Sequence, residues 1–488
     1  MCRNGTKPKQ SRKRTTKREH RESTLPKGQA GRVLDKLLLL EQVIPQDEVL
    51  QVLEVTGHLD TRRCMLTFEV TCWVVLAMGI LTDLPIRQVF KAVRRLYPNE
   101  NTPHRASLCH ARQRLGVAPV RLLFERLARP LANPLNAGAF YKGLRLMGID
   151  GVIFTVPDSD ANAQAFGYPN GGRGQGAFPQ LRKLSLVELG TYAEQALVLK
   201  GIKEKESGEQ NLAPALIRHL KRGMLLMWDR GFFSYNLWQA VLLRCELLAR
   251  VKTCLILRPV KHLLDGSHLS KLYPNAYDRS CDRNGILVRV LRYTHNDPTR
   301  VGCGQEHILL TTLLDAQKYP VDELVVLYHQ RWEIELTFDE QKTHQTPPRA
   351  TKPAHLRSET PLGVIQEIYA LSIGHFVTRS LMAEAATQSG QDPDRLSFVG
   401  CLQILRTRLA ECPTDEQERA AWMAAVLEEL AKERTEPRRN RINPRVVRIK
   451  MSKFKKKRPI HRGQKQLHRD FSDTIVILPI LKSVNRTG

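Results

Sequence analysis

The order of strand-like and helix-like segments between residues 142 and 344 restricts the fold of this chain more than any other feature. Apolar stretches rich in β-branched residues predict four strands, at residues 144–156, 183–188, 195–202 and 224–228. Apolar residues at helical spacing predict helices at residues 210–220 and 236–245. Residues 252–320 again show strand patterns, and a helix then runs from Val321 to about residue 344. We expect the first strand to break near Gly151, as at a hairpin.

This order of elements is that of an RNase H-like fold: three strands, a helix, a strand and a helix, followed by a β insertion and a last helix. The predicted class is α/β, with a mixed sheet interrupted by the insertion and with helical regions at both ends of the core. The predicted segments are a basic disordered arm at 1–30, helices at 31–135, the core at 140–360 with its insertion at 252–320, helices at 361–435 and a basic tail at 436–488.

The charge of the chain is concentrated in two segments. The whole chain carries +27, of which residues 1–36 hold +9 and residues 438–469 hold +14, so that +4 remains for the other 420 residues. Basic segments without apolar periodicity suit DNA, because they neutralise phosphates and release counterions. Anionic lipid is the weaker alternative, since no amphipathic helix accompanies them.

A membrane or secreted location is not expected. The most apolar run, residues 70–81, is shorter than the ~20 residues that span a bilayer, and no secretory signal follows the basic arm. We therefore predict a cytoplasmic protein.

The helices of residues 31–135 are expected to bind DNA. A predicted helix at residues 107–115 carries Arg112 and Arg114, and the helix before it carries Arg87 and Lys91. A solvated basic face on an ordinary helical bundle explains these residues equally well.

Two aspartates stand where apolar strands are expected to end. Asp150 follows residues 144–149, and Asp229 follows residues 224–228. A strand fixes the backbone of such a residue while its carboxylate faces solvent, so both could coordinate a metal ion. Each taken singly is more often a turn or capping residue.

The helix after the insertion adds a third carboxylate. With Glu335 as origin and about 100° per residue, Arg331 lies at about −40°, Tyr328 at about 20° and Lys342 at about −20°. These four residues therefore share one face, and Asp339, at about 40°, shares it too, so the geometry does not choose between Glu335 and Asp339. Glu333, at about 160°, is excluded. An exposed helix with an Arg331–Glu335 ion pair is the alternative.

Three carboxylates on two strands and a helix suit a pair of Mg²⁺ ions, with Mn²⁺ as a substitute. Few oxygen ligands leave room for phosphate and water. Two ions about 3.5–4 Å apart stabilise both the attacking and the leaving oxygen at phosphorus. The reaction class is phosphodiester hydrolysis or transfer.

At these residues the chain resembles the DDE transposases of the bacterial insertion sequence 4 (IS4) family. Tyr328, Arg331, Glu335 and Lys342 fit the family signature Y-x₂-R-x₃-E-x₆-K at every spacing. The blocks around the two aspartates, Gly-Ile-Asp-Gly at 148–151 and Asp-Arg-Gly-Phe-Phe-Ser at 229–234, are similar to the family's, as is the segment 356–364.

The resemblance implies cut-and-paste transposition. Asp150, Asp229 and Glu335 would be the metal-binding triad, and phosphate contacts would come from Tyr328, Arg331, Lys342 and Arg230. The protein would bind the terminal inverted repeats and target DNA as a homodimer in a synaptic complex. It would free a 3′-OH at each end of the element, form a hairpin and join the reopened end to target DNA.

One departure from the family concerns the hairpin. Relatives that form hairpins stack a tryptophan of the insertion on a flipped base, but residues 252–320 contain no Trp. Either Tyr293 or another tyrosine of the insertion substitutes, or the flipped base is stabilised in a different way. The alternative functions are an RNase H-like nuclease without strand transfer, and a catalytically idle DNA-binding repressor of transposition.

Overall fold

The computed structural model describes most of the chain between residues 37 and 478. The described residues are 37–60, 64–93, 102–136, 138–171, 174–298, 302–331, 333–346, 356–436, 441–442, 446–447, 455–456, 458–459, 467–468 and 470–478. The predicted arm at 1–30 and most of the basic segment 438–469 lie outside them.

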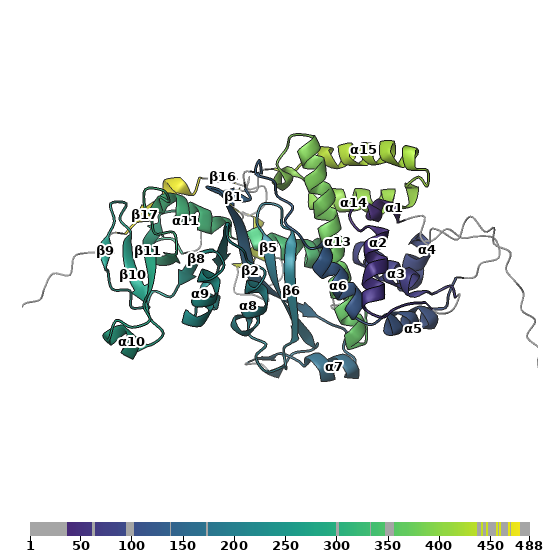
Figure 1. The fold of residues 1–488 in the computed structure, drawn as a ribbon, viewed down its shortest axis with the longest axis horizontal. Helices are drawn as coiled ribbons and strands as arrows, with labels where there is room; N and C mark the ends of the chain where they lie inside the picture. Colours follow the sequence, from purple (N-terminus) through teal and green to yellow (C-terminus); the bar gives the residue numbers. More distant parts are fainter. Residues whose placement is uncertain are drawn as a thin grey trace, which may run out of the picture. The chain divides into compact units, whose positions relative to one another are not determined.

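A large mixed sheet forms the centre of the protein (Figure 1). Its strands follow the order β6-β5-β2-β7-β8-β12-β11-β10-β9. The first five are β6 (Glu194–Gly201), β5 (Gln180–Glu188), β2 (Leu144–Thr155), β7 (Met224–Trp228) and β8 (Glu246–Val251). Strands β2, β7 and β8 run parallel, whereas β5 and β6 are antiparallel to their neighbours. This order and these directions are those of an RNase H-like fold, which confirms the predicted fold class.

Both faces of this five-stranded part are covered, which explains why its strands read as nearly continuous apolar runs. Met147 and Ile149 pack with helices α8 (Glu209–Ile217) and α9 (Tyr235–Leu242) on one face. Leu146 packs on the other face with helices α11 (Val321–Gln330) and α12 (Glu333–Asp339). The two faces therefore belong to different apolar clusters.

The insertion continues the core sheet. Its strands are β9 (Lys261–His262), β10 (His268–Leu272), β11 (Ile286–His295) and β12 (His307–Thr311), with the short helix α10 (Ala276–Ser280) between β10 and β11. Strand β12 pairs antiparallel with β8 from Ile308–Val251 to Thr311–Leu248. The insertion thus adds strands to the edge that β8 offers.

A strand from the predicted basic tail joins this extension. Strand β17 (Ile475–Ile477) pairs antiparallel with β11, and Phe471 just before it is buried. The ring of Phe471 lies 3.7 Å, between centroids, from that of His329 on α11. The tail is therefore partly integrated into the fold.

The remaining strands are short. Strand β1 (Phe140–Tyr141) pairs with the start of β2, and three two-stranded ladders of two residues per strand lie outside the large sheet. Their strands are β3 (Asn170–Gly171), β4 (Gly174–Gln175), β13 (Arg441–Ile442), β14 (Val446–Val447), β15 (Lys455–Lys456) and β16 (Leu467–His468).

Helices precede and follow the core. The N-terminal ones are α1 (Leu38–Glu41), α2 (Gln46–Val55), α3 (Phe68–Ile80), α4 (Ile86–Val93), α5 (Arg105–Leu115) and α6 (Ala118–Leu127). The others are α7 (Asp160–Phe166), α13 (Pro361–Gln388), α14 (Phe398–Arg408) and α15 (Glu416–Lys432), with single turns η1 (Arg230–Phe232), η3 (Pro393–Arg395), η4 (Leu409–Glu411) and η6 (Ser472–Thr474). No helix of the described residues is both long and apolar enough to cross a membrane.

Helices α3 and α13 pack backbone against backbone. A Cβ atom built on Gly79 of α3 would overlap the carbonyl oxygen of Ala370, and one on Gly374 of α13 would lie 2.9 Å from the Gly79 carbonyl. Only glycine allows so close an approach. The contact joins the N-terminal helices to α13, whose residues Val364 and Ile368 also pack against Phe154 of β2.

Candidate active site

Asp150 lies inside strand β2, not at its end. The strand continues to Thr155 because β5 pairs with it along its whole second half, with Ser185 opposite Asp150. The parallel pairing with β7 stops earlier, at Gly148 and Met227. The predicted strand end at Asp150 therefore corresponds to the end of the pairing with β7 and not to the end of β2. The predicted break at Gly151 is absent: a Cβ atom there would lie 2.5 Å from the Glu209 carboxylate, so the glycine makes room for this side chain of α8.

Asp229 directly follows β7, as predicted. Its carboxylate caps the short helix η1 by accepting a hydrogen bond of 2.7 Å from the backbone N–H of Arg230. The Arg230 side chain is exposed. Asp150 makes a similar bond, accepting 2.8 Å from the N–H of Gly151. Each aspartate is therefore held in orientation by the residue that follows it.

The helix predicted from Val321 to about residue 344 is interrupted twice. Helix α11 ends at Gln330 and α12 begins at Glu333, and a π-helical segment, η2 (Glu340–Gln345), replaces the α-helix after Asp339. A uniform 100° per residue therefore does not describe this segment.

The end of α11 is nevertheless tied to both aspartate-bearing strands. The Tyr328 hydroxyl donates a hydrogen bond of 3.2 Å to the carbonyl of Trp228, the residue before Asp229. Arg331 is buried, and its Nη1 atom lies 3.6 Å from Oδ2 of Asp150. Its guanidinium also lies 5.8 Å from the centroid of the Tyr328 ring. One turn of helix thus contacts strands β2 and β7.

The electrostatics of Asp150 reflect this crowding. Burial raises the pKa of Asp150 above its usual range, and the nearby carboxylates of Glu209 and Asp229 raise it further. The Gly151 N–H and the Arg331 guanidinium act in the opposite direction without cancelling the effect. A cation beside Asp150 would therefore stabilise its ionised form.

Glu335 and Asp339 are both exposed residues of α12, but their neighbours differ. The Glu335 carboxylate is close enough to Arg331 to raise the pKa of that guanidinium. Asp339 instead faces His344, with 3.3 Å between its Oδ2 and the ring Nε2. Glu335 is therefore the carboxylate of α12 that shares Arg331 with Asp150.

Lys342 reaches strand β2 from the π-helical segment. Its Nζ donates a hydrogen bond of 2.9 Å to the carbonyl of Ile153, three residues after Asp150. Burial lowers the pKa of Lys342. The structure thus places Arg331 and Lys342 at neighbouring points of the same strand.

The donor atoms suit a divalent cation, but these side chains are not gathered around one point. Carboxylate oxygens are the ligands that Mg²⁺ prefers. In the described part of the chain, no three His, Cys, Asp or Glu side chains lie close enough together to hold a metal ion. Burial lowers the pKa of Arg331, but Tyr328 and the carboxylates of Asp150, Asp229 and Glu335 together raise it, so all three acids are near enough to act on this one guanidinium.

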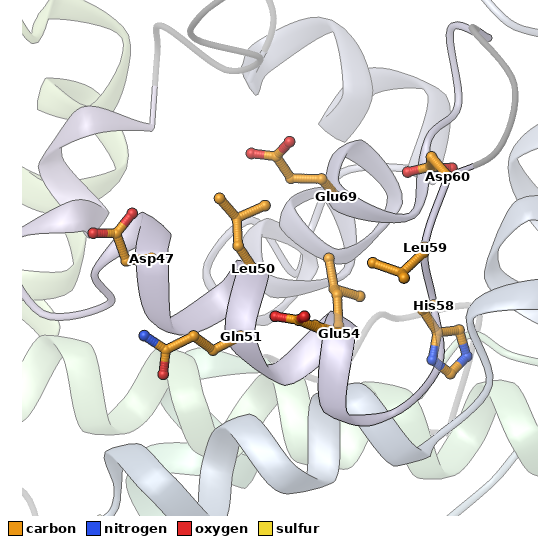
Figure 2. A pocket seen from close by; sticks show the side chains of 9 residues that line it. Asp47, Leu50, Gln51, Glu54, His58, Leu59, Asp60 and Glu69 are labelled. Atoms are coloured by element: carbon orange, nitrogen blue, oxygen red, sulfur yellow. The ribbon is translucent and has the colours of Figure 1, made fainter.

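A cavity elsewhere in the protein has the wrong chemistry for phosphate. It has a volume of about 490 Å³ and lies between α2, the loop after it and the start of α3 (Figure 2). Its lining includes four carboxylates, those of Asp47, Glu54, Asp60 and Glu69. This cavity would repel the DNA backbone, so it is not a candidate for the catalytic site.

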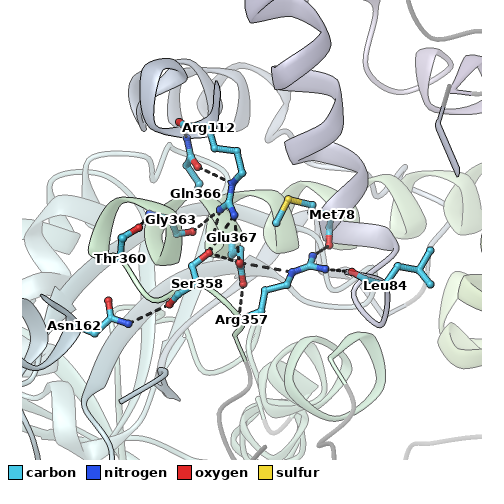
Figure 3. Close-up of polar contacts among 10 residues, drawn as sticks. All are labelled: Met78, Leu84, Arg112, Asn162, Arg357, Ser358, Thr360, Gly363, Gln366 and Glu367. Carbon is cyan, nitrogen blue, oxygen red and sulfur yellow. Dashed lines mark hydrogen bonds and ion pairs between the residues drawn. The ribbon is translucent and has the colours of Figure 1, made fainter. Parts of the chain in front are cut away.

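Arg112, a predicted DNA contact, is buried inside the protein. It donates hydrogen bonds to Ser358, Gln366 and the carbonyl of Gly363, and lies 3.8 Å from the Glu367 carboxylate (Figure 3). Arg114, two residues later, is exposed and remains available to DNA. The prediction that both arginines lie on a basic surface that contacts DNA is therefore wrong for Arg112.

Arg357, in the segment 356–364 that the resemblance singled out, completes this cluster. It donates to the carbonyls of Met78 and Leu84, and lies 3.7 Å from Glu367 (Figure 3). The segment thus joins the end of α3 to α13. Sequence reasoning also missed Glu209 beside Asp150, for which the only signal was the glycine at 151.

Two family models match the chain. One, described as insertion element 4 transposase N-terminal, matches residues 34–125. The other, described as transposase DDE domain, matches residues 142–351. The second match contains Asp150, Asp229 and the segment from Tyr328 to Lys342.

Several known proteins are similar over long stretches. The transposase InsG for insertion sequence element IS4 of Escherichia coli (strain K12) is 28% identical over 412 residues, which cover 82% of this chain and 89% of InsG. The putative transposase InsZ of the same strain is 26% identical over 200 residues, 41% of this chain and 65% of InsZ. Among solved structures, the piggyBac transposase synaptic complex with hairpin DNA aligns with a TM-score of 0.42 and 12% identity, over 80% of this chain and 85% of that one.

Proposed function

Because the chain belongs to the IS4 family of DDE transposases, we propose that it moves an insertion sequence by cut-and-paste transposition. In this proposal it binds the terminal inverted repeats, cleaves DNA at the ends of the element and transfers the freed 3′-OH ends to target DNA. Such a substrate places the protein at the bacterial nucleoid.

Divalent metal dependence follows from the DDE domain. We assign Asp150, Asp229 and Glu335 as the residues that would hold the metal, with two Mg²⁺ ions as the expected occupants. When bound, such ions lower the pKa of water or of a 3′-OH and neutralise charge at phosphorus. Asp339, which faces His344, is not assigned to the metal.

The observation that carries this assignment is the position of Arg331. This buried guanidinium pairs with Asp150, and the carboxylates of Asp229 and Glu335 also interact with it electrostatically, although the three acids come from two strands and a helix. A single cationic group is therefore within electrostatic range of all three carboxylates. The hydrogen bond from Tyr328 to Trp228 keeps the helix end in place beside both strands.

The phosphate contacts follow from the same geometry. Arg331 can offer paired N–H donors to a phosphate, and Lys342 a compact charge. The Ile153 carbonyl, which now accepts from Lys342, would be replaced by a phosphate oxygen. We add the exposed side chain of Arg230, which follows Asp229 directly. Tyr328, predicted as a further phosphate contact, is 4% exposed and donates its hydroxyl proton to Trp228, so we assign it to positioning the helix end instead.

For the hairpin step we place base stacking on Tyr277. Tyr293, the predicted substitute, is 2% exposed and lies among aromatic rings of the sheet, so it cannot meet a base. Tyr277 on α10 is 68% exposed. The loop after α10 approaches the catalytic side, because the Tyr235 hydroxyl, six residues after Asp229, donates 2.6 Å to the carbonyl of Asn284.

The other parts of the chain receive supporting roles in this proposal. Residues 31–135 form the DNA-binding helical domain, residues 140–360 the catalytic core and residues 361–435 a helical region that braces both. The basic segments at 1–30 and 436–488 add affinity for DNA that does not depend on its sequence. Pairing of two element ends would require two copies of the protein.

A matched pair of variants tests the catalytic assignment. Purified protein is incubated with Mg²⁺ and a duplex that carries its own element's end, and cleaved and joined products are separated. We expect Glu335→Gln to bind the duplex like wild type and to lose cleavage by more than about 10²-fold, because a charged ligand of the metal would be lost. Asp339→Asn, on the same helix, should cleave within a few-fold of wild type.

Equal cleavage by Glu335→Gln and wild type would refute the assigned triad. Cleaved ends without joined products from wild type would favour a nuclease over a transposase. Binding without cleavage by wild type would favour a repressor.

A further inference from the structure

The segment that carries Lys342 has an unusual backbone. Residues Glu340–Gln345 are π-helical, and the N–H of Thr346 bonds to the carbonyl of Gln341 at 3.2 Å, which closes a turn one residue wider than an α-helical one. Segments of this kind are rare and often occur at functional sites. The turn therefore requires an explanation beyond helix propensity.

Three long polar side chains of this turn are buried, and together they are bonded to α3, α13 and β5. Their relative exposures are 3% for Glu340 and 0% for Gln341 and Gln345. Burial of such groups is unfavourable unless they find hydrogen-bond partners. Their partners thus define how the turn is held.

Glu340 and Gln345 attach the turn to helices. Glu340 accepts from Nε2 of His375 at 2.9 Å and from Nε of Arg379 at 3.0 Å, both on α13. Gln345 donates 2.6 Å to the carbonyl of Gly79 in α3 and 2.9 Å to that of Leu371 in α13. The two bonds of Gln345 lie at the close crossing of α3 and α13.

Gln341 attaches the turn to the catalytic sheet. Its Oε1 accepts a hydrogen bond of 2.8 Å from Nζ of Lys183 on β5. Lys183 is fully buried and pairs with Glu194 of β6, which in turn accepts a bond of 2.5 Å from the Ser185 hydroxyl. Ser185 is the residue of β5 directly opposite Asp150. A continuous buried network therefore runs from Gln341 to the neighbour of Asp150.

We propose that Gln341 is a positioning residue for Lys342, and that its bond to Lys183 fixes where the Lys342 ammonium meets DNA. Lys342 follows Gln341 directly, and its Nζ lies at the Ile153 carbonyl on the next strand of the same sheet. The network holds the π-helical turn at a fixed distance from β5, and this fixes how far the Lys342 side chain extends along β2. This inference rests on the proposed phosphate contact of Lys342.

The experiment measures the salt dependence of binding to a duplex with a cleaved element end. A lost phosphate contact reduces the slope of log K against log salt by about 0.9, equivalent to a threefold to fourfold smaller loss of affinity between about 50 and 200 mM salt. We expect this reduction in Lys342→Met and in Gln341→Met, whose side chain has a similar shape but cannot accept from Lys183. The double variant should show no further reduction.

Ser372→Ala is the matched control. The Ser372 hydroxyl accepts from the same Lys183 Nζ at 2.8 Å but belongs to α13, so its removal should leave the slope unchanged. Melting temperatures of all variants are compared, since a purely structural role would lower stability in both Gln341→Met and Ser372→Ala without changing the slope. Should Gln341→Met not fold, Gln341→Asn, which is too short to reach Lys183, replaces it.

The two proposals fail in different ways. If Lys342→Met reduces the slope and Gln341→Met does not, or if the two reductions add, the positioning role of Gln341 is refuted while the phosphate contact stands. If Lys342→Met leaves the slope unchanged, the phosphate contact and the inference built on it are both refuted.

Discussion

Arg112 and Arg114 stand two residues apart on α5, yet their environments are opposite. Arg112 is buried against Ser358, Gln366 and Glu367, which lie about 250 positions later in the chain. Arg114 is exposed and donates to the carbonyl of Leu66. Identical side chains thus serve packing in one case and remain open to DNA in the other.

The two arginines should therefore respond differently to substitution. Arg112→Met leaves the buried Glu367 with one fewer cationic partner, and we expect a loss of about 3 kcal/mol in the free energy of unfolding. Arg114→Ala should change stability by less than about 0.5 kcal/mol. Urea unfolding followed by circular dichroism measures both. A larger loss for Arg114→Ala than for Arg112→Met would contradict the burial that separates them.

The candidate site residues were chosen from the signature spacing, whereas the residues that they contact in the structure could not be predicted from it. Tyr328, Arg331 and Lys342 were chosen from a helix geometry that the structure does not have, yet each reaches β2 or the end of β7. The bonds that hold them come from Trp228, Asp150 and Ile153, far away in sequence. Local periodicity carries no information on such contacts.

At the scale of elements, the close crossing of α3 and α13 tolerates no side chain larger than that of glycine at Gly79. Every residue of α3 from Val70 to Ile80 is buried, so the helix shows no polar face. Gly79 meets the backbone of Ala370, and the carbonyl of Gly79 also accepts from Gln345. A side chain at this position would separate two helices and break a buried hydrogen bond.

Gly79→Ala should accordingly destabilise the protein strongly. The added methyl group collides with a backbone carbonyl that cannot rotate away, so we expect a loss of about 3 kcal/mol, at the upper end for overpacking. Gly208→Ala is the control, because the nearest atom to its Cβ, Asn211 Nδ2, is 3.7 Å away. Its effect should stay below about 1 kcal/mol. Similar midpoints of thermal unfolding for the two variants would show that the crossing is less tight than described.

Strong apolar runs predicted their elements well, and short segments with mixed propensity did not. Strand β7, with the sequence Met-Leu-Leu-Met-Trp, has the predicted bounds of residues 224–228. Strand β8 was missed, because Glu-Leu-Leu-Ala-Arg-Val favours a helix by composition and becomes a strand through its pairing with β7 and β12. Helix α2 was not predicted as a separate element, and its N-cap, Pro45, offers no side-chain acceptor as a start signal.

At the scale of the whole molecule, charge and catalysis are separated along the chain. Residues 438–469 carry +14 of the total of +27, while the catalytic candidates lie in a body that is almost balanced. Residues 470–478 beyond the basic segment contain β17 and the buried Phe471, so the segment is followed by an integral part of the sheet. Removing the tail as a block would therefore damage the fold together with the charge.

Neutralisation of charge is the better test of the tail. We expect replacement of the five basic residues within 453–458 by Gln to weaken binding equally for specific and random duplexes, and to reduce the salt slope by as much as about 4. Cleavage at saturating DNA and the melting temperature should remain close to wild type. The measurement is the affinity for each duplex between about 50 and 200 mM salt. An unchanged slope of log K against log salt would show that this segment does not contact DNA.

Strand β17 also has a consequence for how the protein is made. Its partner β11 ends at His295, and β17 begins 180 residues later, at Ile475. At roughly 5–20 residues per second, the ribosome needs roughly 10–40 s to deliver it. Until then the edge of β11 and, once it has been synthesised, the ring of His329, two residues before Arg331, lack the neighbours that β17 and Phe471 provide. The packing of β11 and of the His329 ring, close to the candidate active site, is thus completed only by a segment synthesised long after both of them.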